Sequence, residues 1–156
     1  MQQAIEAAFQ IAASELGEAE QRLFQQFKAG LNQGKYRAAS PDASAATGWV
    51  VNAWVKKGIL LGFRLGQIVD MSVNVQRQPF FDKATYPVKT FTAQSGVRIV
   101  PGGSSIRDGC YVGRGVTCMP PMYINAGAYV DDGTMVDSHA LVGSCAQVGQ
   151  DRKSVV

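Results

Sequence analysis

The sequence has little histidine, little cysteine and no long apolar run. His139 is the only histidine among 156 residues, so no multi-histidine metal site can be built within one chain. The cysteines Cys110, Cys118 and Cys145 are odd in number, widely spaced and free of any Cys-x-x-Cys pair, which argues against a disulfide framework or a zinc site. We therefore expect no bound metal, and three small, buried, reduced thiols.

No stretch approaches the roughly 18 uninterrupted apolar residues of a membrane span. Residues 1–6, MQQAIE, lack the basic region and apolar run of a signal peptide. The formal net charge of +3 is small and scattered, which argues against nucleic acid as a partner. We expect a cytoplasmic protein with no membrane partner.

Apolar residues recur at helical spacing in the first third of the chain. Gly17 is expected to separate two helices, and residues 32–34 to end the second. Small polar residues at 40–48 predict a loop, and the apolar segment 49–65 predicts a third helix. The interpretation is a helical domain over residues 1–70, followed by a linker and strand over 71–94, where valine, glycine and proline rise.

Three basic residues, Lys56, Lys57 and Arg64, lie in the third helical segment. A solvated helix face and an anion-binding role both fit this pattern, and the sequence leaves the choice open.

A six-residue period runs through the second half of the chain. Counting in sixes from Val100 meets eight aliphatic residues and one cysteine: Val100, Ile106, Val112, Cys118, Ile124, Val130, Val136, Val142 and Val148. Glycine or proline stands three positions earlier in most repeats, which suits a turn. An amphipathic helix would need a period of 3.6, so the pattern predicts a β-solenoid with three hexapeptides per coil. We place this solenoid at residues 95–150, about three coils.

The residues on this repeat resemble a particular enzyme family. The stretch 95–149, above all MPPMYINAGAYVDDGTMVD and VGSCAQVG, closely resembles the tetrahydrodipicolinate N-succinyltransferases. Upstream, WVKKGILLGFRL (54–65) and FFDK (80–83) are also similar to that family. The resemblance implies an α+β chain, in which a helical N-terminal domain precedes a left-handed parallel β-helix.

The family resemblance also implies a reaction. It is the transfer of a succinyl group from succinyl-coenzyme A, a co-substrate, to the amine of 2-amino-6-oxopimelate, the ring-opened form of tetrahydrodipicolinate, in lysine and diaminopimelate biosynthesis. It further implies a homotrimer with active sites between neighbouring β-helices.

Two residues match the family's functional positions. Arg98 matches the substrate-binding arginine, and Asp137 matches the substrate-binding and catalytic acid. A guanidinium suits a carboxylate of the substrate, and an acid near the amine could take its proton. Taken alone, Arg98 could instead cap the solenoid and Asp137 could be an ordinary corner residue. Met119, Tyr123 and Asn125, in the same segment, are interpreted as structural.

The resemblance stops near residue 150. The coenzyme A site and a second active-site acid are expected in later coils, so we expect a truncated β-helix that is inactive by itself. Residues 151–156, DRKSVV, correspond to the translation of a common sequencing-adapter string, and Ser154 stands where the period asks for an aliphatic residue. We expect this tail to be non-native.

Alternative functions differ in the sequence features they need. Another hexapeptide acyltransferase would use acetyl-coenzyme A, but the helical domain and the GTMVDSH segment argue against it. A solenoid carbonic anhydrase needs three histidines on zinc, which one histidine cannot supply. A non-catalytic solenoid used for assembly stays open.

Overall fold

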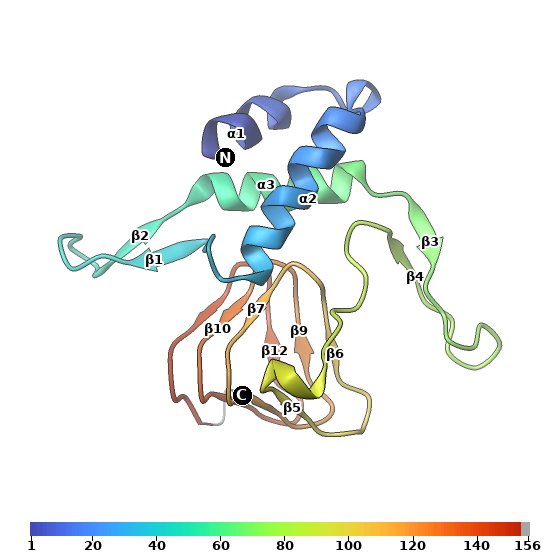
Figure 1. The fold of residues 1–156 in the computed structure, drawn as a ribbon, viewed down its shortest axis with the longest axis vertical. Coiled ribbons are helices and arrows are strands. Elements are labelled where there is room, and N and C mark those ends of the chain that lie inside the picture. The colour runs from blue at the N-terminus through green and yellow to red at the C-terminus, as the bar shows by residue number, and fades with distance from the viewer. Residues whose placement is uncertain (154–156) are drawn as a thin grey trace.

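The structure is a computed structural model that describes residues 1–153. A group of helices lies at one end of a β-solenoid, and two thin hairpins extend to opposite sides (Figure 1). The chain therefore has two parts, and the second contains the repeats that the sequence predicted.

The first part contains three α-helices and a short 3-10 turn: α1 (Gln2–Gln10), η1 (Ala13–Glu15), α2 (Glu18–Asn32) and α3 (Ala53–Leu65). The break near Gly17 is confirmed. The backbone N–H of Gly17 donates to the carboxylate of Glu20 at 2.8 Å, which satisfies one of the donors left unpaired where α2 begins. No helix within residues 1–153 is long and apolar enough to cross a membrane.

Helix α3 packs against α1, α2 and the solenoid. Its apolar face joins the core of the helical part, whose fully buried large side chains are Ile5, Phe24, Phe27, Leu31, Val55, Leu61 and Tyr86. Gly58 lets α3 approach α2 closely, because a Cβ there would lie 2.6 Å from the Phe27 ring. On its other side Ile59 contacts Gly127 of the solenoid, where an added Cβ would lie within 2.2 Å of it.

The predicted third helix is wrong at its beginning. Residues Trp49–Val51 form strand β2, which pairs antiparallel with β1 (Ala39–Pro41), and α3 begins only at Ala53. The Trp-Val-Val run has high strand propensity, and its pairing with β1 outweighs the helical periodicity. The first hairpin is therefore built partly from residues assigned to a loop and partly from residues assigned to a helix.

The structure settles the role of Arg64. Its guanidinium donates to the carbonyl oxygens of Phe9, at 2.8 Å, and of Ile11, which closes the C-terminal end of α1. The ammonium of Lys57 lies 3.6 Å from the carboxylate of Glu6, in a half-exposed ion pair between α3 and α1. Lys56 is exposed, so a solvated face describes it well.

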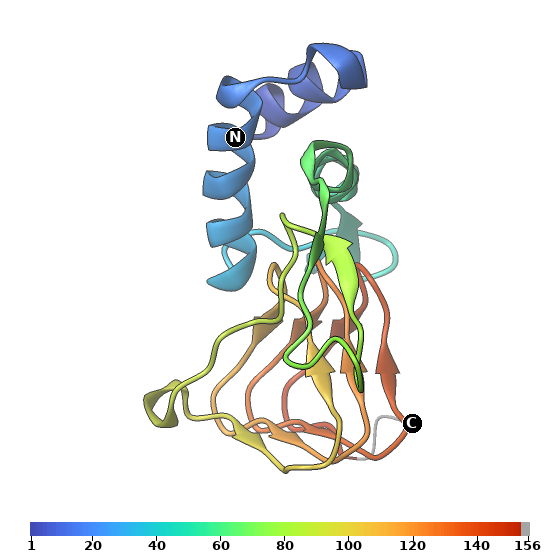
Figure 2. The same ribbon diagram turned by 90° about the vertical axis from the view of Figure 1, so that its right-hand side faces the viewer.

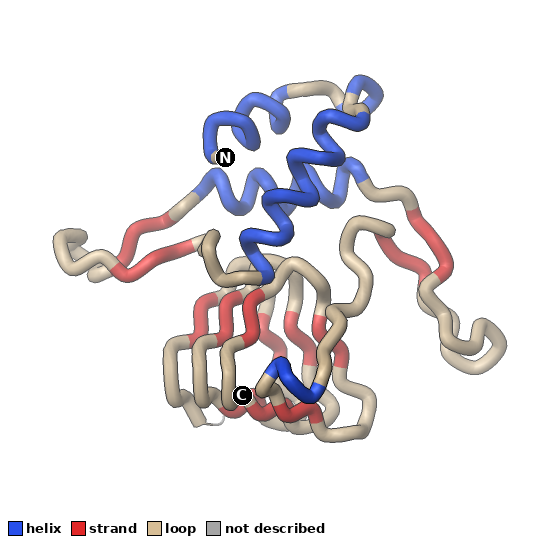
Figure 3. Tube along the Cα trace, in the orientation of Figure 1, coloured by secondary structure: helices blue, strands red, loops and turns tan. Residues whose placement is uncertain are grey.

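The second hairpin joins the helices to the solenoid. It consists of β3 (Ile68–Asp70) and β4 (Phe81–Lys83), paired antiparallel, and its tip projects away from the body of the molecule (Figure 3). The hairpin begins inside the residues predicted to be helical domain and ends inside the predicted linker.

Nine two-residue strands build the solenoid: β5 (Arg98–Ile99), β6 (Ser105–Ile106), β7 (Tyr111–Val112), β8 (Thr117–Cys118), β9 (Tyr123–Ile124), β10 (Tyr129–Val130), β11 (Met135–Val136), β12 (Leu141–Val142) and β13 (Gln147–Val148). They form three parallel sheets with the orders β5-β8-β11, β6-β9-β12 and β7-β10-β13. Seen from the side, the three sheets enclose one core as the walls of a prism (Figure 2). The predicted coil of three hexapeptides is confirmed.

The six-residue period holds from β6 to β13. Tyr111 pairs with Tyr129 and Tyr129 with Gln147, which is 18 residues per coil. The first coil differs, because Ile99, and not Val100, pairs with Cys118. The step from Ile99 to Ile106 is therefore seven residues in place of six, and the prediction that Val100 begins the six-residue series is wrong. The extra residue falls in the Gly102–Gly103 turn, where positive φ values of 146° and 89° let the chain absorb it.

Inward-facing residues from two positions of each repeat form the core of the solenoid. Val97 at one end and Val148 at the other pack against a fully or nearly buried set: Ile106, Cys110, Val116, Cys118, Met122, Ile124, Ala128, Val130, Val136, Ala140 and Val142. Asp151 and Arg152 still bond to the previous coil, through Asp132 and Met135. The remainder of the tail predicted to be non-native, residues 154–156 with Ser154, lies outside the described residues.

Candidate functional site

The two residues singled out by the sequence flank one corner of the solenoid. Residues 100–104, 119–122 and 137–140 connect the β5-β8-β11 sheet to the β6-β9-β12 sheet in three successive coils. We call these three stacked turns the Asp137 corner. Arg98 lies just before the first turn, and Asp137 begins the third.

Arg98 is exposed on the outer face of β5. It occupies the same register position as Thr117 in β8 and Met135 in β11. Its backbone N–H donates to the carbonyl of Val116 at 2.9 Å, so the pairing of the first coil fixes the backbone from which the guanidinium projects.

Asp137 is half-buried and directly follows the buried Val136. Its carboxylate accepts the N–H of Ser138 at 2.8 Å, and its carbonyl accepts the N–H of Ala140 at 3.1 Å. Both bonds hold the chain in the turn, so the carboxylate has a fixed place at the corner.

The structure brings Arg98 and Asp137 to the same sheet, two strands and two residues apart. Met135 is the register partner of Arg98 two strands away, and Asp137 lies two residues further on. With usual strand spacing and rise, their Cα atoms are about 12 Å apart. A ligand with two separated polar groups could therefore span both side chains.

A shallow groove of about 320 Å³ opens beside the same corner. Its lining residues come from all three coils: Gly103, Ser105, Pro121, Met122, Tyr123, His139, Ala140 and Leu141. Ser105, Tyr123 and Leu141 share one outward register position on β6, β9 and β12. Tyr123, interpreted from the sequence as structural, thus contributes to a surface that a ligand could reach.

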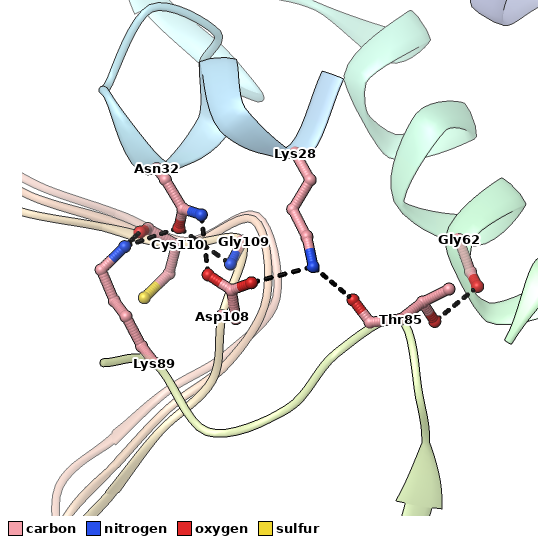
Figure 4. Close-up of polar contacts among 8 residues, drawn as sticks. All are labelled: Lys28, Asn32, Gly62, Thr85, Lys89, Asp108, Gly109 and Cys110. Atoms are coloured by element: carbon pink, nitrogen blue, oxygen red, sulfur yellow. Dashed lines mark hydrogen bonds and ion pairs between the residues drawn. The ribbon is translucent and has the colours of Figure 1, made fainter. Parts of the chain in front are cut away.

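A second polar cluster joins α2 to the solenoid, and no sequence pattern indicated it. The ammonium of Lys28 lies 2.9 Å from the carboxylate of Asp108 and 2.9 Å from the carbonyl of Thr85 (Figure 4). Asn32 donates to the other carboxylate oxygen of Asp108 at 2.7 Å and accepts the N–H of Gly109 at 2.9 Å. These contacts fix the helical part onto the corner before β7.

Lys89 completes this cluster. Its ammonium donates to the side-chain oxygen of Asn32, at 2.5 Å, and to the carbonyl of Cys110, at 3.0 Å. Burial lowers the pKa of Lys89. Burial alone would raise the pKa of Asp108, but hydrogen bonds from Lys28 and Asn32 outweigh it and hold that pKa below its usual value. Every member has a partner here, which indicates a structural junction more than a ligand site.

The cysteines behave largely as the sequence predicted. All three are free, Cys110 and Cys118 are buried, and Cys145 is only partly so. Burial raises the pKa of Cys110 to about 12 and that of Cys118 to about 11, so both thiols stay protonated at neutral pH. Among residues 1–153 no group of three or more histidine, cysteine or acidic side chains is placed to hold a metal ion.

Comparisons with known proteins bear on both parts of the chain. Residues 1–65 match the family model described as tetrahydrodipicolinate N-succinyltransferase N-terminal. A 2,3,4,5-tetrahydropyridine-2,6-dicarboxylate N-succinyltransferase of Xylella fastidiosa is 46% identical over 105 residues, which is 64% of this chain and 35% of that protein. The enzyme of the same name from Herminiimonas arsenicoxydans is 44% identical over 103 residues, again 64% and 35%.

A longer match extends well into the solenoid. The enzyme of the same name from Haemophilus influenzae is 40% identical over 138 residues, which is 81% of this chain and 46% of that protein. The chain thus spans between a third and a half of the curated relatives it matches. Its similarity to proteins named tetrahydrodipicolinate N-succinyltransferase thus extends over the helical part and into the repeats.

Proposed function

We propose, from this relationship, that the chain is the N-terminal part of an enzyme that succinylates the amine derived from tetrahydrodipicolinate. The acyl donor would be succinyl-coenzyme A, and the pathway would be lysine and diaminopimelate biosynthesis. The observation that carries the proposal is the 40% identity over 138 residues to a named succinyltransferase. The arrangement of Arg98 and Asp137 supports it, because the acceptor has an amine and two carboxylates.

In this proposal Arg98 binds a substrate carboxylate. It is exposed on the face that leads to the Asp137 corner, where its guanidinium can form a charge-assisted pair with an incoming anion. The separation of about 12 Å between the two Cα atoms leaves room for a substrate chain between their side chains.

Asp137 acts on the reacting amine. Its carboxylate accepts the amine's proton while the nitrogen attacks the thioester carbonyl carbon. A C–N bond forms, the C–S bond breaks, and the leaving thiolate takes up a proton to give free coenzyme A. The amine becomes a succinyl amide, so atoms and charges balance without an oxidant or reductant.

Several finer features belong to the same proposal. The solenoid is a left-handed β-helix spanning residues 95–150, after a helical domain at 1–70 and a linker at 71–94. The active enzyme is a cytoplasmic homotrimer, whose coenzyme A site and second acid lie in coils beyond residue 150. The 156-residue chain alone is then inactive, and residues 151–156 are a non-native tail.

The test is a free-thiol assay with succinyl-coenzyme A and the tetrahydrodipicolinate-derived amine. The longer protein that contains this chain should release one thiol per succinyl amide formed, and the 156-residue chain should release none. Thiol release that needs acetyl-coenzyme A in place of succinyl-coenzyme A would instead favour another acyltransferase. Turnover by the 156-residue chain would overturn the placement of the acyl-donor site.

A further inference from the structure

His139 has a backbone conformation that most turns of this solenoid give to glycine. Its φ is 64°, in the left-handed region. The residues at the same place in other turns are mostly glycines with φ between 70° and 87°: Gly109, Gly115, Gly127 and Gly133. Side chains with a Cβ are disfavoured there, and histidine is among the few that are tolerated.

Cys145 lies six residues after His139 and occupies the same place in the next turn. It has nearly the same φ, 66°, but its side chain is partly buried against the core of the helical part. Packing therefore accounts for a side chain at Cys145. His139 is exposed and lines the groove, so burial does not offset its backbone strain. A role for its imidazole in the groove would offset that cost.

His139 lies near the Asp137 carboxylate and shares its groove with two hydroxyl groups. It follows Asp137 by two residues, so their Cα atoms are at most about 7 Å apart. Its own N–H donates to the carbonyl of Pro121, which fixes the turn over the middle coil. Ser105 and Tyr123 line the same groove and bring hydroxyl groups that can also donate to an anion.

We propose that the imidazole of His139 binds the carboxylate attached to the carbon that carries the reacting amine. This makes His139 a specificity-determining residue, and the proposal rests on the proposed function. An amine and a carboxylate on the same carbon need two binding groups that lie close together. Asp137 and His139 provide these two groups. The distal carboxylate needs a group further away, which Arg98 provides from two coils below.

A binding experiment tests this without any acyl transfer. His139 is the only histidine, so its imidazole signals in an NMR spectrum of this chain need no further assignment. Three probes dissect the acceptor: 2-aminopimelate has both carboxylates, 2-aminohexanoate has only the one beside the amine, and 6-aminohexanoate has only the distal one. The signals should move with the first two probes and stay in place with the third. An equal response to all three, or no response to 2-aminopimelate, overturns the proposal.

Two variants carry the test into the longer protein. His139→Asn keeps a residue that tolerates the left-handed region, and His139→Gly removes the strain, so both should fold. We expect at least a tenfold rise in KM for 2-aminopimelate with little change in kcat, and the same loss in both variants. Arg114→Ala, at an exposed residue away from the groove and the Asp137 corner, should keep the wild-type KM.

These measurements distinguish a failure of the proposed function from a failure of the proposed role of His139. A wild-type protein that transfers no succinyl group, while its His139 signals still follow the probe pattern, would sink the proposed function alone. A wild-type protein that does transfer it, with variants that keep the wild-type preference for 2-aminopimelate over 6-aminohexanoate, would sink the role of His139 alone.

Discussion

Lys28 of helix α2 and Asp108 of the solenoid form an ion pair of 2.9 Å between residues 80 positions apart. Their side chains are only 11% and 20% exposed, so little water screens the pair. The same carboxylate accepts from Asn32, whose oxygen in turn accepts from Lys89. The Asp108 carboxylate thus holds Lys28 and Asn32 of α2, and through Asn32 the linker residue Lys89, against the first coil.

Asp108→Asn should destabilise the fold. The substitution keeps the shape but leaves Lys28 with no counter-charge at a mostly buried place, which should cost about 2–4 kcal/mol. Urea unfolding measures the loss. The control is Glu18→Gln, which breaks an exposed pair with Arg22 and should change stability by less than about 0.5 kcal/mol. Equal effects of the two variants would show that the Lys28–Asp108 pair contributes no more to stability than an exposed ion pair.

The same carboxyl should make stability depend on pH. Its pKa in the folded chain lies below the ordinary value of 3.8, so the unfolded chain binds its proton first as the pH falls. The stability that the Asp108 carboxylate contributes is present above the ordinary pKa and is lost as the pH drops through the lowered pKa. Unfolding free energies from about pH 6 to about pH 2 should therefore fall less steeply in Asp108→Asn than in the wild type.

The thiols should react in a fixed order. Burial holds Cys110 and Cys118 protonated and out of reach, whereas Cys145 is only partly covered. Iodoacetamide at neutral pH should label Cys145 first, and mass spectrometry identifies the site. Labelling of Cys118 as fast as Cys145 would contradict an intact solenoid core, and labelling in urea gives the reference rate for all three.

Gly62→Ala should weaken the packing of α3. A Cβ at this position would lie 2.3 Å from the Phe24 ring and 2.5 Å from the hydroxyl of Tyr86. Core overpacking of this kind costs about 1–3 kcal/mol, which thermal or urea unfolding detects. Gly143→Ala is the matched control, because a Cβ added there would meet no atom within 4 Å and the stability should hardly change.

The two predicted site residues should affect different kinetic constants in the longer protein. Arg98→Ala should raise KM by an amount equivalent to about 2–4 kcal/mol, because a charge-assisted contact to a carboxylate is lost. Asp137→Asn should lower kcat far more than stability, since it keeps the shape and removes the base. Arg114→Ala, an exposed arginine away from the Asp137 corner, serves as the control. Near-normal kinetics for both variants would disprove the assigned roles.

Some parts of this structure could be predicted from the sequence and others could not, because they depend on contacts at different distances along the chain. Each turn of the solenoid repeats the same six-residue pattern of apolar residues and glycines. This period correctly predicted the strands β6 to β13. One inserted residue in the Gly102–Gly103 turn was enough to move Ile99 into the place assigned to Val100. The change of spacing is hidden in the sequence because Ile99 and Val100 are both aliphatic.

The sequence by itself determined the two-part organisation, the three-sheet solenoid and the free thiols, because periodicity and composition act within a few residues of each position. Only the tertiary structure decided that Lys28, Asn32, Lys89 and Asp108 meet, since contacts across tens of residues depend on how the helices lie on the coils. It also decided that His139 lines a groove beside Asp137. A left-handed turn and the stacking of three coils set the direction of that side chain, and no local pattern encodes both.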